Sequence, residues 1–174
     1  MKEFLEKVGL IDHFTTIIEV EKDTFIRKFE GNVKQARIDV FSENPFDVFS
    51  SDKATYKGHV GFDGFRIKKR RKLFNTQGNY PIIAEGFFSQ SGKTLIIETE
   101  INGIPLFFQL VYGLLILMFI FGFTTLLRGH VVLSGLLPLL VIPTIIGVQC
   151  FLFTKAVKNL KKDLEKDFFD WSKP

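Results

Sequence analysis

Residues 86–94, with the sequence GFFSQSGKT, contain the residue types of a phosphate-binding loop. Such a loop has a glycine, four further residues and then Gly-Lys-Ser/Thr at the start of a helix, whose N-terminus holds the phosphate. Here five residues separate Gly86 from Gly92, and the residues after Thr94 alternate as in a β-strand. We therefore expect Ser91-Gly92 to form a hairpin turn, and the segment predicts no nucleotide site.

The other residues that could do chemistry form no catalytic or metal-binding pattern. His13, His59 and His130 lie far apart on different expected elements, without a Ser-His-Asp arrangement or a metal-ligand spacing. The single cysteine, Cys150, can form no disulfide within the chain and falls inside an apolar run, where it acts as a small hydrophobic residue. The sequence therefore predicts no catalytic residue, no metal and no cofactor, and we expect a protein that is not an enzyme.

Five adjacent cations form the strongest local signal in the charged part of the chain: Lys68, Lys69, Arg70, Arg71 and Lys72. Near an anionic membrane surface each such cation contributes about 1 kcal/mol of binding free energy. The run is therefore a candidate contact for anionic lipid headgroups or another anionic ligand, and the alternative is a solvated strand end. Residues 1–104 hold 16 Lys and Arg against 15 Asp and Glu, so the basic excess of a nucleic-acid-binding domain is absent.

Two long uncharged runs dominate the second half of the chain. Residues 105–127 and 131–154 contain 23 and 24 residues without a charge, and Arg128-Gly129-His130 separates them. At about 1.5 Å per residue, each run spans roughly 34 Å or more as a helix, enough for a hydrocarbon core of about 30 Å. Neither run has the polar face that a soluble helix needs. The sequence therefore predicts a transmembrane hairpin of two antiparallel helices over residues 105–154.

Prolines and glutamines are the distinctive residues of the two runs. Pro138 and Pro143 predict a kink in the second helix, or else a broken helix that lines a transport path. Gln109 and Gln149 fall at the same end of an antiparallel hairpin, where a hydrogen bond between them would contribute about 1 kcal/mol. The runs contain no Asp, Glu, Lys or Arg, the groups that usually mark ion pathways, so we favour a structural role for these residues.

The distribution of lysines predicts the topology. The tail that follows the second run is rich in lysine, whereas the turn between the runs offers only Arg128 and His130. Because cytoplasmic segments carry the excess of Lys and Arg, we expect the tail in the cytoplasm, and two antiparallel spans put the N-terminal domain there as well. The N-terminus lacks the apolar stretch of a signal peptide. We therefore expect a multi-pass protein of the inner (plasma) membrane with both termini cytoplasmic.

The tail, residues 155–174, predicts an amphipathic basic helix. Its apolar residues fall on one stripe at helical spacing: Val157, Leu160, Leu164, Phe168 and Trp171. Aromatic side chains favour the membrane interface, which makes Phe168 and Trp171 candidate interfacial anchors. The alternative is that the stripe packs against the protein's own N-terminal domain.

Residues 1–104 predict an α+β domain with one main helix on an antiparallel meander sheet. Strand patterns cover residues 14–20, 56–62, 65–68, 82–89 and 93–101, with a turn at Asp63-Gly64, and helical spacing covers residues 23–33. Only residues 102–105 separate the last strand from the first uncharged run, so we expect the sheet to lie close to the bilayer.

Two stretches, residues 56–74 (YKGHVGFDGFRIKKRRKLF) and residues 92–107 (GKTLIIETEINGIPLF), together resemble a group of small bacterial two-span membrane proteins with an N-terminal α+β domain. The resemblance implies the same layout and no established activity. Our leading hypothesis is a binding module that the hairpin holds at the membrane surface, with the lipid bilayer and a lipid headgroup or protein as partners. The alternative is a subunit of an oligomeric channel or transporter.

Overall fold

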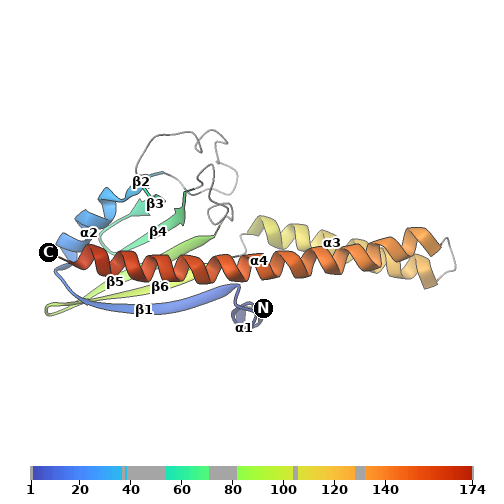
Figure 1. The fold of residues 1–174 in the computed structure, drawn as a ribbon, viewed down its shortest axis with the longest axis horizontal. Coiled ribbons are helices and arrows are strands. Elements are labelled where there is room, and N and C mark those ends of the chain that lie inside the picture. The colour runs from blue at the N-terminus through green and yellow to red at the C-terminus, as the bar shows by residue number, and fades with distance from the viewer. Residues whose placement is uncertain are drawn as a thin grey trace.

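The computed structural model describes residues 2–36, 38, 54–70, 82–103, 106–127 and 132–173, with the backbone alone for 106–110, 125–127 and 132–140. A sheet domain lies at one end of an elongated molecule, and two long helices extend from it side by side (Figure 1). The elements in chain order are α1 (Lys2–Lys7), β1 (Ile11–Glu19), α2 (Lys22–Gly31), β2 (Val33–Gln35), β3 (Tyr56–Val60), β4 (Gly64–Lys69), β5 (Ile83–Ser91), β6 (Thr94–Asn102), α3 (Leu106–Leu127) and α4 (Val132–Ser172).

The strands form one mixed sheet in the order β1-β6-β5-β4-β3-β2. This sheet and its helices confirm the prediction of an α+β domain. The prediction of an antiparallel meander is wrong in two respects. β2 runs parallel to β3, and β1, the first strand in the chain, pairs with β6, the last. Alternation of side chains identifies a strand but does not record which strand lies beside it, so these two pairings left no signal in the sequence.

The longest helix, α4, runs without a break for 41 residues. Its first half lies beside α3, and its second half crosses one face of the sheet (Figure 1). The apolar stripe of that second half is buried in the core of the sheet domain: Val157, Leu160, Leu164 and Phe168. The tail is therefore the main helix on the sheet, together with α2, and it shares one hydrophobic core with residues 1–104.

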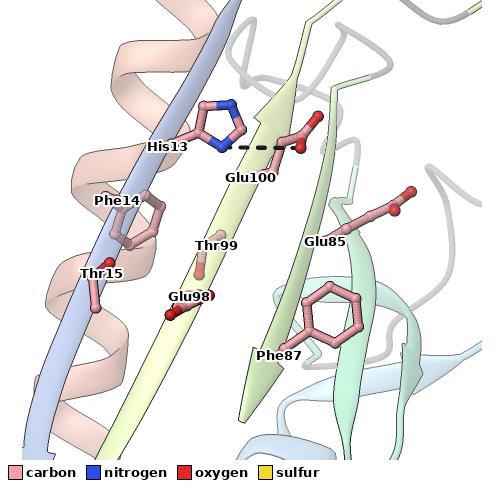
Figure 2. Close-up of a pocket in the computed structure, with 8 residues that line it drawn as sticks. All are labelled: His13, Phe14, Thr15, Glu85, Phe87, Glu98, Thr99 and Glu100. Atoms are coloured by element: carbon pink, nitrogen blue, oxygen red, sulfur yellow. Dashed lines mark ion pairs between the residues drawn. The ribbon is translucent and has the colours of Figure 1, made fainter. Parts of the chain in front are cut away.

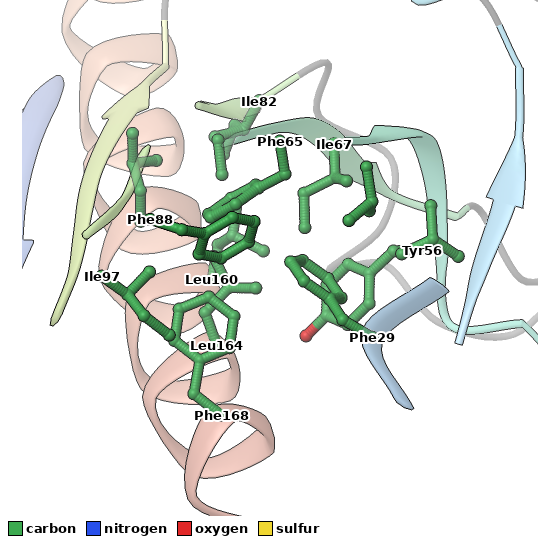
Figure 3. Close-up of a cluster of buried hydrophobic side chains, with 14 of the residues drawn as sticks. Phe29, Tyr56, Phe65, Ile67, Ile82, Phe88, Ile97, Leu160, Leu164 and Phe168 are labelled. Atoms are coloured by element: carbon green, nitrogen blue, oxygen red, sulfur yellow. The ribbon is translucent and has the colours of Figure 1, made fainter. Parts of the chain in front are cut away.

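Aromatic rings fill the centre of this core (Figure 3). The ring of Phe168 lies edge-on to Phe25, Phe29 and Phe65, with centroids 5.7–5.8 Å apart. These rings come from α4, α2 and β4, so one cluster ties both helices to the sheet. Such edge-to-face contacts add about 0.5–1.5 kcal/mol per pair beyond the burial of apolar area.

Among the residues whose side chains the structure describes, one helical segment is long and apolar enough to be a candidate membrane span. Val141–Ser172 within α4 is long and apolar enough, by length and composition, to cross a membrane, and Val111–Thr124 of α3 is a shorter apolar helix. Several large apolar side chains project from α3 and α4 into the surroundings, among them Leu117, Phe121, Val148 and Phe151. The second span of the predicted hairpin remains a prediction.

Candidate functional site

The two faces of the sheet have different surroundings. Successive side chains of a strand point to opposite faces, and α4 with α2 covers the face that carries Phe65, Ile97 and the other core residues. We call the opposite side the open face. It includes His13, Thr15 and Ile17 of β1, Ile96, Glu98 and Glu100 of β6, Glu85 and Phe87 of β5, Arg66 and Lys68 of β4, and Lys57 of β3.

A pocket of about 480 Å³ lies on the open face (Figure 2). The register of the strands builds it in two rows: His13 lies opposite Glu100 and Glu100 opposite Glu85, while Glu98 lies between Thr15 and Phe87. Directly opposite residues have Cβ atoms about 4.5–5.5 Å apart, so each row brings its side chains into mutual reach. The Phe87 ring is 71% exposed beside the carboxylates.

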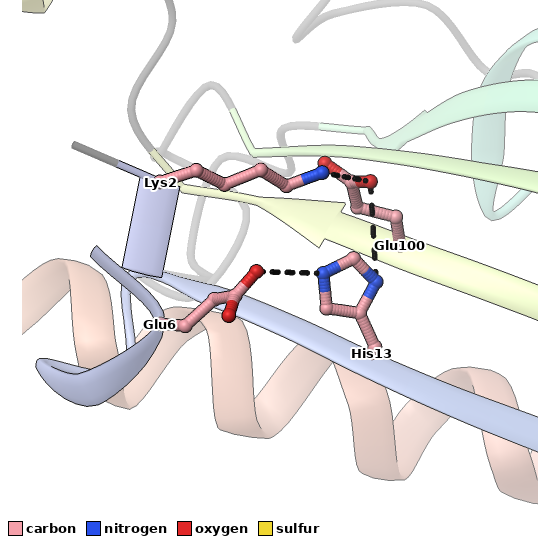
Figure 4. A network of polar contacts seen from close by, with 4 residues as sticks. All are labelled: Lys2, Glu6, His13 and Glu100. Atoms are coloured by element: carbon pink, nitrogen blue, oxygen red, sulfur yellow. Dashed lines mark hydrogen bonds and ion pairs between the residues drawn. The ribbon is translucent and has the colours of Figure 1, made fainter. Parts of the chain in front are cut away.

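Ion pairs surround the pocket without neutralising it. Arg66 Nε lies 2.9 Å from Glu85, and Lys2 Nζ lies 3.0 Å from Glu100. His13 lies between Glu6, at 3.3 Å, and Glu100, at 3.9 Å (Figure 4). Exposed pairs of this kind contribute only about 0–1 kcal/mol each. Glu98 makes no ion pair with any residue that the structure describes, so the pocket keeps an acidic character.

The pocket offers carboxylates and an apolar ring. Among the described residues that line it, no hydroxyl or thiol is hydrogen-bonded to a base. Within the described part of the chain, no three His, Cys, Asp or Glu side chains are arranged to hold a metal ion. The arrangement can accept cationic and apolar groups from a partner.

A second polar cluster lies beneath α4 and fastens it to the sheet. The Tyr56 hydroxyl donates to Asp167 at 2.6 Å, and Lys69 donates to Asp163. Burial raises the pKa of the Tyr56 phenol far above its usual range, and the neighbouring Asp167 raises it further. Burial also raises the pKa of Asp167, and the hydrogen bond from Tyr56 offsets part of that rise.

The structure describes three residues of the cation run, Lys68, Lys69 and Arg70, and all three interact with other parts of the protein. Lys68 and Arg70 are only 9% and 8% exposed, and Arg70 donates to the Ala54 carbonyl at 3.3 Å. Lys69 bonds to Asp163 of α4. Arg71 and Lys72 lie outside the described residues. The three described residues of the run therefore offer little to an anionic membrane surface.

The glutamines and prolines that the sequence singled out lie in the two helices of the hairpin. Gln149 Oε1 accepts a hydrogen bond from the Tyr112 hydroxyl at 2.9 Å, a partner that sequence reasoning missed. The side chain of Gln109, the other predicted partner, lies outside the described residues. Pro138 and Pro143 both fall within α4, which stays helical past each of them. The helix is therefore bent at most, and it is not broken.

The two aromatic residues of the tail lie in the domain. Phe168 has no exposed surface, and Trp171 stacks on Phe29 with ring centroids 4.8 Å apart. This placement favours packing against the domain over the interfacial anchor, because a ring buried in the core is not free to contact lipid.

Comparison with protein-family models, curated proteins and solved structures finds no match. The resemblance to small bacterial two-span proteins therefore remains a prediction, and function has to be argued from the structure itself. The open-face pocket was missed at the sequence level, although the alternation of Glu98 and Glu100 with apolar residues already placed both carboxylates away from the core.

Proposed function

We propose that this protein is an integral membrane protein whose α3–α4 hairpin holds a small binding domain at the cytoplasmic membrane surface. The observation that carries the proposal is the course of α4, which begins beside α3 in an apolar hairpin and ends in the core of the sheet domain. From Lys155 to its end, the helix extends roughly 27 Å beyond the uncharged run. A shared rigid helix would fix both the height and the orientation of the domain above the bilayer.

The lysine-rich second half of α4 supports the cytoplasmic side for this domain, following the excess of positive charge in cytoplasmic segments. Because the same half of α4 packs on the sheet, the domain must lie on the side of the membrane that the tail occupies. One of these lysines, Lys161, bonds to Asp12 of β1 at 3.1 Å. In this proposal α3 and the first half of α4 both cross the bilayer.

The partner that fits the open face is a protein segment with basic and apolar side chains. Glu85, Glu98 and Glu100 supply negative charge, and the exposed Phe87 ring supplies an apolar contact between them. Complementary charge of this kind accelerates association and excludes acidic partners, while a central aromatic ring contributes contact area. We prefer a protein partner to lipid, because the three carboxylates that line the pocket would repel anionic headgroups.

The test measures binding of a fluorescent peptide of alternating arginine and leucine to the full-length protein in zwitterionic vesicles. We expect saturable binding that weakens with salt, and Glu98→Lys should weaken it about tenfold. Glu30→Lys is the matched control, because it makes the same change of charge on the exposed side of α2. No saturable binding, or equal loss in both variants, would contradict the proposal.

The alternative of a channel or transporter subunit receives less support. It was motivated by Pro138, Pro143 and the two glutamines, but α4 continues past both prolines and Gln149 is bonded to Tyr112 within the hairpin. Neither feature supplies a path for a solute, so anchoring is the function that we propose.

A further inference from the structure

The short helix α1 lies where the sheet domain meets the helical hairpin (Figure 1). Thr154, the last residue of the uncharged run 131–154, donates from its hydroxyl to the Val8 carbonyl at 3.1 Å. The turn after α1 is closed by bonds from Val8 to Phe4 and from Leu10 to Leu5, and Gly9 has a φ of 76°, which favours glycine. These contacts hold α1 at the level at which α4 emerges from its uncharged run.

One side of α1 bonds to and packs against the sheet domain. Lys2 bonds to Glu100 and Glu6 to His13, both on the open face (Figure 4), and Leu5 packs against the core. Residues four apart in a helix share a side, so Lys2 and Glu6 together orient α1 on the end of the sheet.

Two apolar residues, Phe4 on α1 and Val8 in the turn after it, lie outside the domain core. Phe4 is 65% exposed and Val8 is 36% exposed. Exposed apolar side chains also follow α4 toward this point: Val141, Ile145, Val148 and Phe151. Exposed apolar side chains therefore lie both on α4 and near α1, which the bond from Thr154 to Val8 joins, and the exposed Lys7 and Lys155 are next to that junction in the chain.

We propose that α1 lies in the interface of the lipid bilayer, with Phe4 and Val8 among the headgroups and upper acyl chains. Lys7 and Lys155 would then face the headgroup phosphates. This combination of exposed aromatic and apolar side chains with flanking lysines at the end of a span is typical of interfacial segments. The inference rests on the proposed function, because the hairpin must be inserted for α1 to reach the bilayer. A third membrane contact would limit rotation of the domain about α4.

The experiment uses the Phe4→Trp variant of the full-length protein in vesicles that contain lipid brominated near the headgroup. We expect the emission of the introduced indole to be quenched by the brominated lipid and shifted to shorter wavelength. The natural Trp171, which packs in the domain core, supplies the unquenched baseline. Phe87→Trp is the matched control, because that ring is similarly exposed but lies on the open face. Both substitutions replace exposed rings, so they should leave the fold unchanged.

Two outcomes overturn the inference in different ways. If the Phe4→Trp variant is quenched no more than the Phe87→Trp variant while the protein resists extraction by alkaline carbonate, α1 does not contact lipid and the membrane anchor stands. If alkaline carbonate extracts the protein from the vesicles, the proposed function fails and the inference fails with it.

Discussion

Replacing Phe168 with alanine tests whether the tail of α4 is a core helix of the sheet domain. The ring has no exposed surface and lies within 5.8 Å, between centroids, of Phe25, Phe29 and Phe65. Truncating a fully buried phenylalanine removes its burial and leaves a cavity, at a cost of about 3–5 kcal/mol. A domain of this size has a free energy of unfolding of about 5–15 kcal/mol, so Phe168→Ala should remove a large part of it.

The assay is urea unfolding of the full-length protein in detergent micelles, followed by Trp171 fluorescence. Trp171 stacks on Phe29 in the folded domain, so its emission reports the loss of the core. With a dependence of about 1–3 kcal/mol per molar urea, the midpoint for Phe168→Ala should fall by roughly 2 M.

The neighbouring residue provides the control. Phe169 is 52% exposed on the same helix, so Phe169→Ala should change the free energy of unfolding by less than about 0.5 kcal/mol. If the tail instead lay on lipid, both rings would be remote from the sheet. Equal midpoints for the two variants would therefore refute our reasoning.

Three further predictions use the same assay. Lys161 and Asp12, which bond α4 to β1, should show a coupling energy of about 0.5 kcal/mol in a double-mutant cycle, and 1 M salt should reduce it; additive single substitutions would contradict this. Burial holds the pKa of Asp167 above its ordinary 3.8, so its contribution to stability is complete below about pH 3.8 and is lost as the pH rises through the folded-state pKa. Asp167→Asn should remove this pH dependence of the free energy of unfolding, and an unchanged dependence in the variant would contradict the prediction. A Cβ at Gly103 would lie 2.7 Å from a core side chain of α4, so Gly103→Ala should cost about 1–3 kcal/mol, whereas Gly31→Ala, with open space around it, should not destabilise the protein.

The strands β1 and β3 to β6 and the hairpin turn were predictable because their signals are local, whereas Val33, which begins β2, was expected at the end of a helix. Alternating apolar residues identify β5 and β6, and a glycine at the turn allows the φ of +61° that the structure has at Gly92. The surface against which the tail packs was not predictable in the same way. An amphipathic stripe predicts that a helix buries one side. The same stripe is expected whether that side lies against lipid or against a sheet.

The candidate site depended on contacts between distant parts of the chain. The pocket forms because Thr15 of β1 pairs with Glu98 of β6, a register that alternation alone does not specify. The cation run predicted an exposed surface, whereas Lys68 and Lys69 belong to β4, an inner strand between β3 and β5. Side chains of an inner strand meet neighbours on both sides, which is why Lys68 and Lys69 lie among the protein's own contacts.

Accessibility of nitroxide labels along α4, in lipid vesicles and with Cys150 replaced by serine, tests the central claim most directly. The claim is that one helix passes from the bilayer into the core of the domain. Labels at Ile145 and Val148 should be accessible to oxygen and shielded from a water-soluble nickel reagent, whereas labels at Lys162 and Phe169 should show the reverse. Nickel access at positions 145 and 148 equal to that at 162 and 169 would contradict the claim.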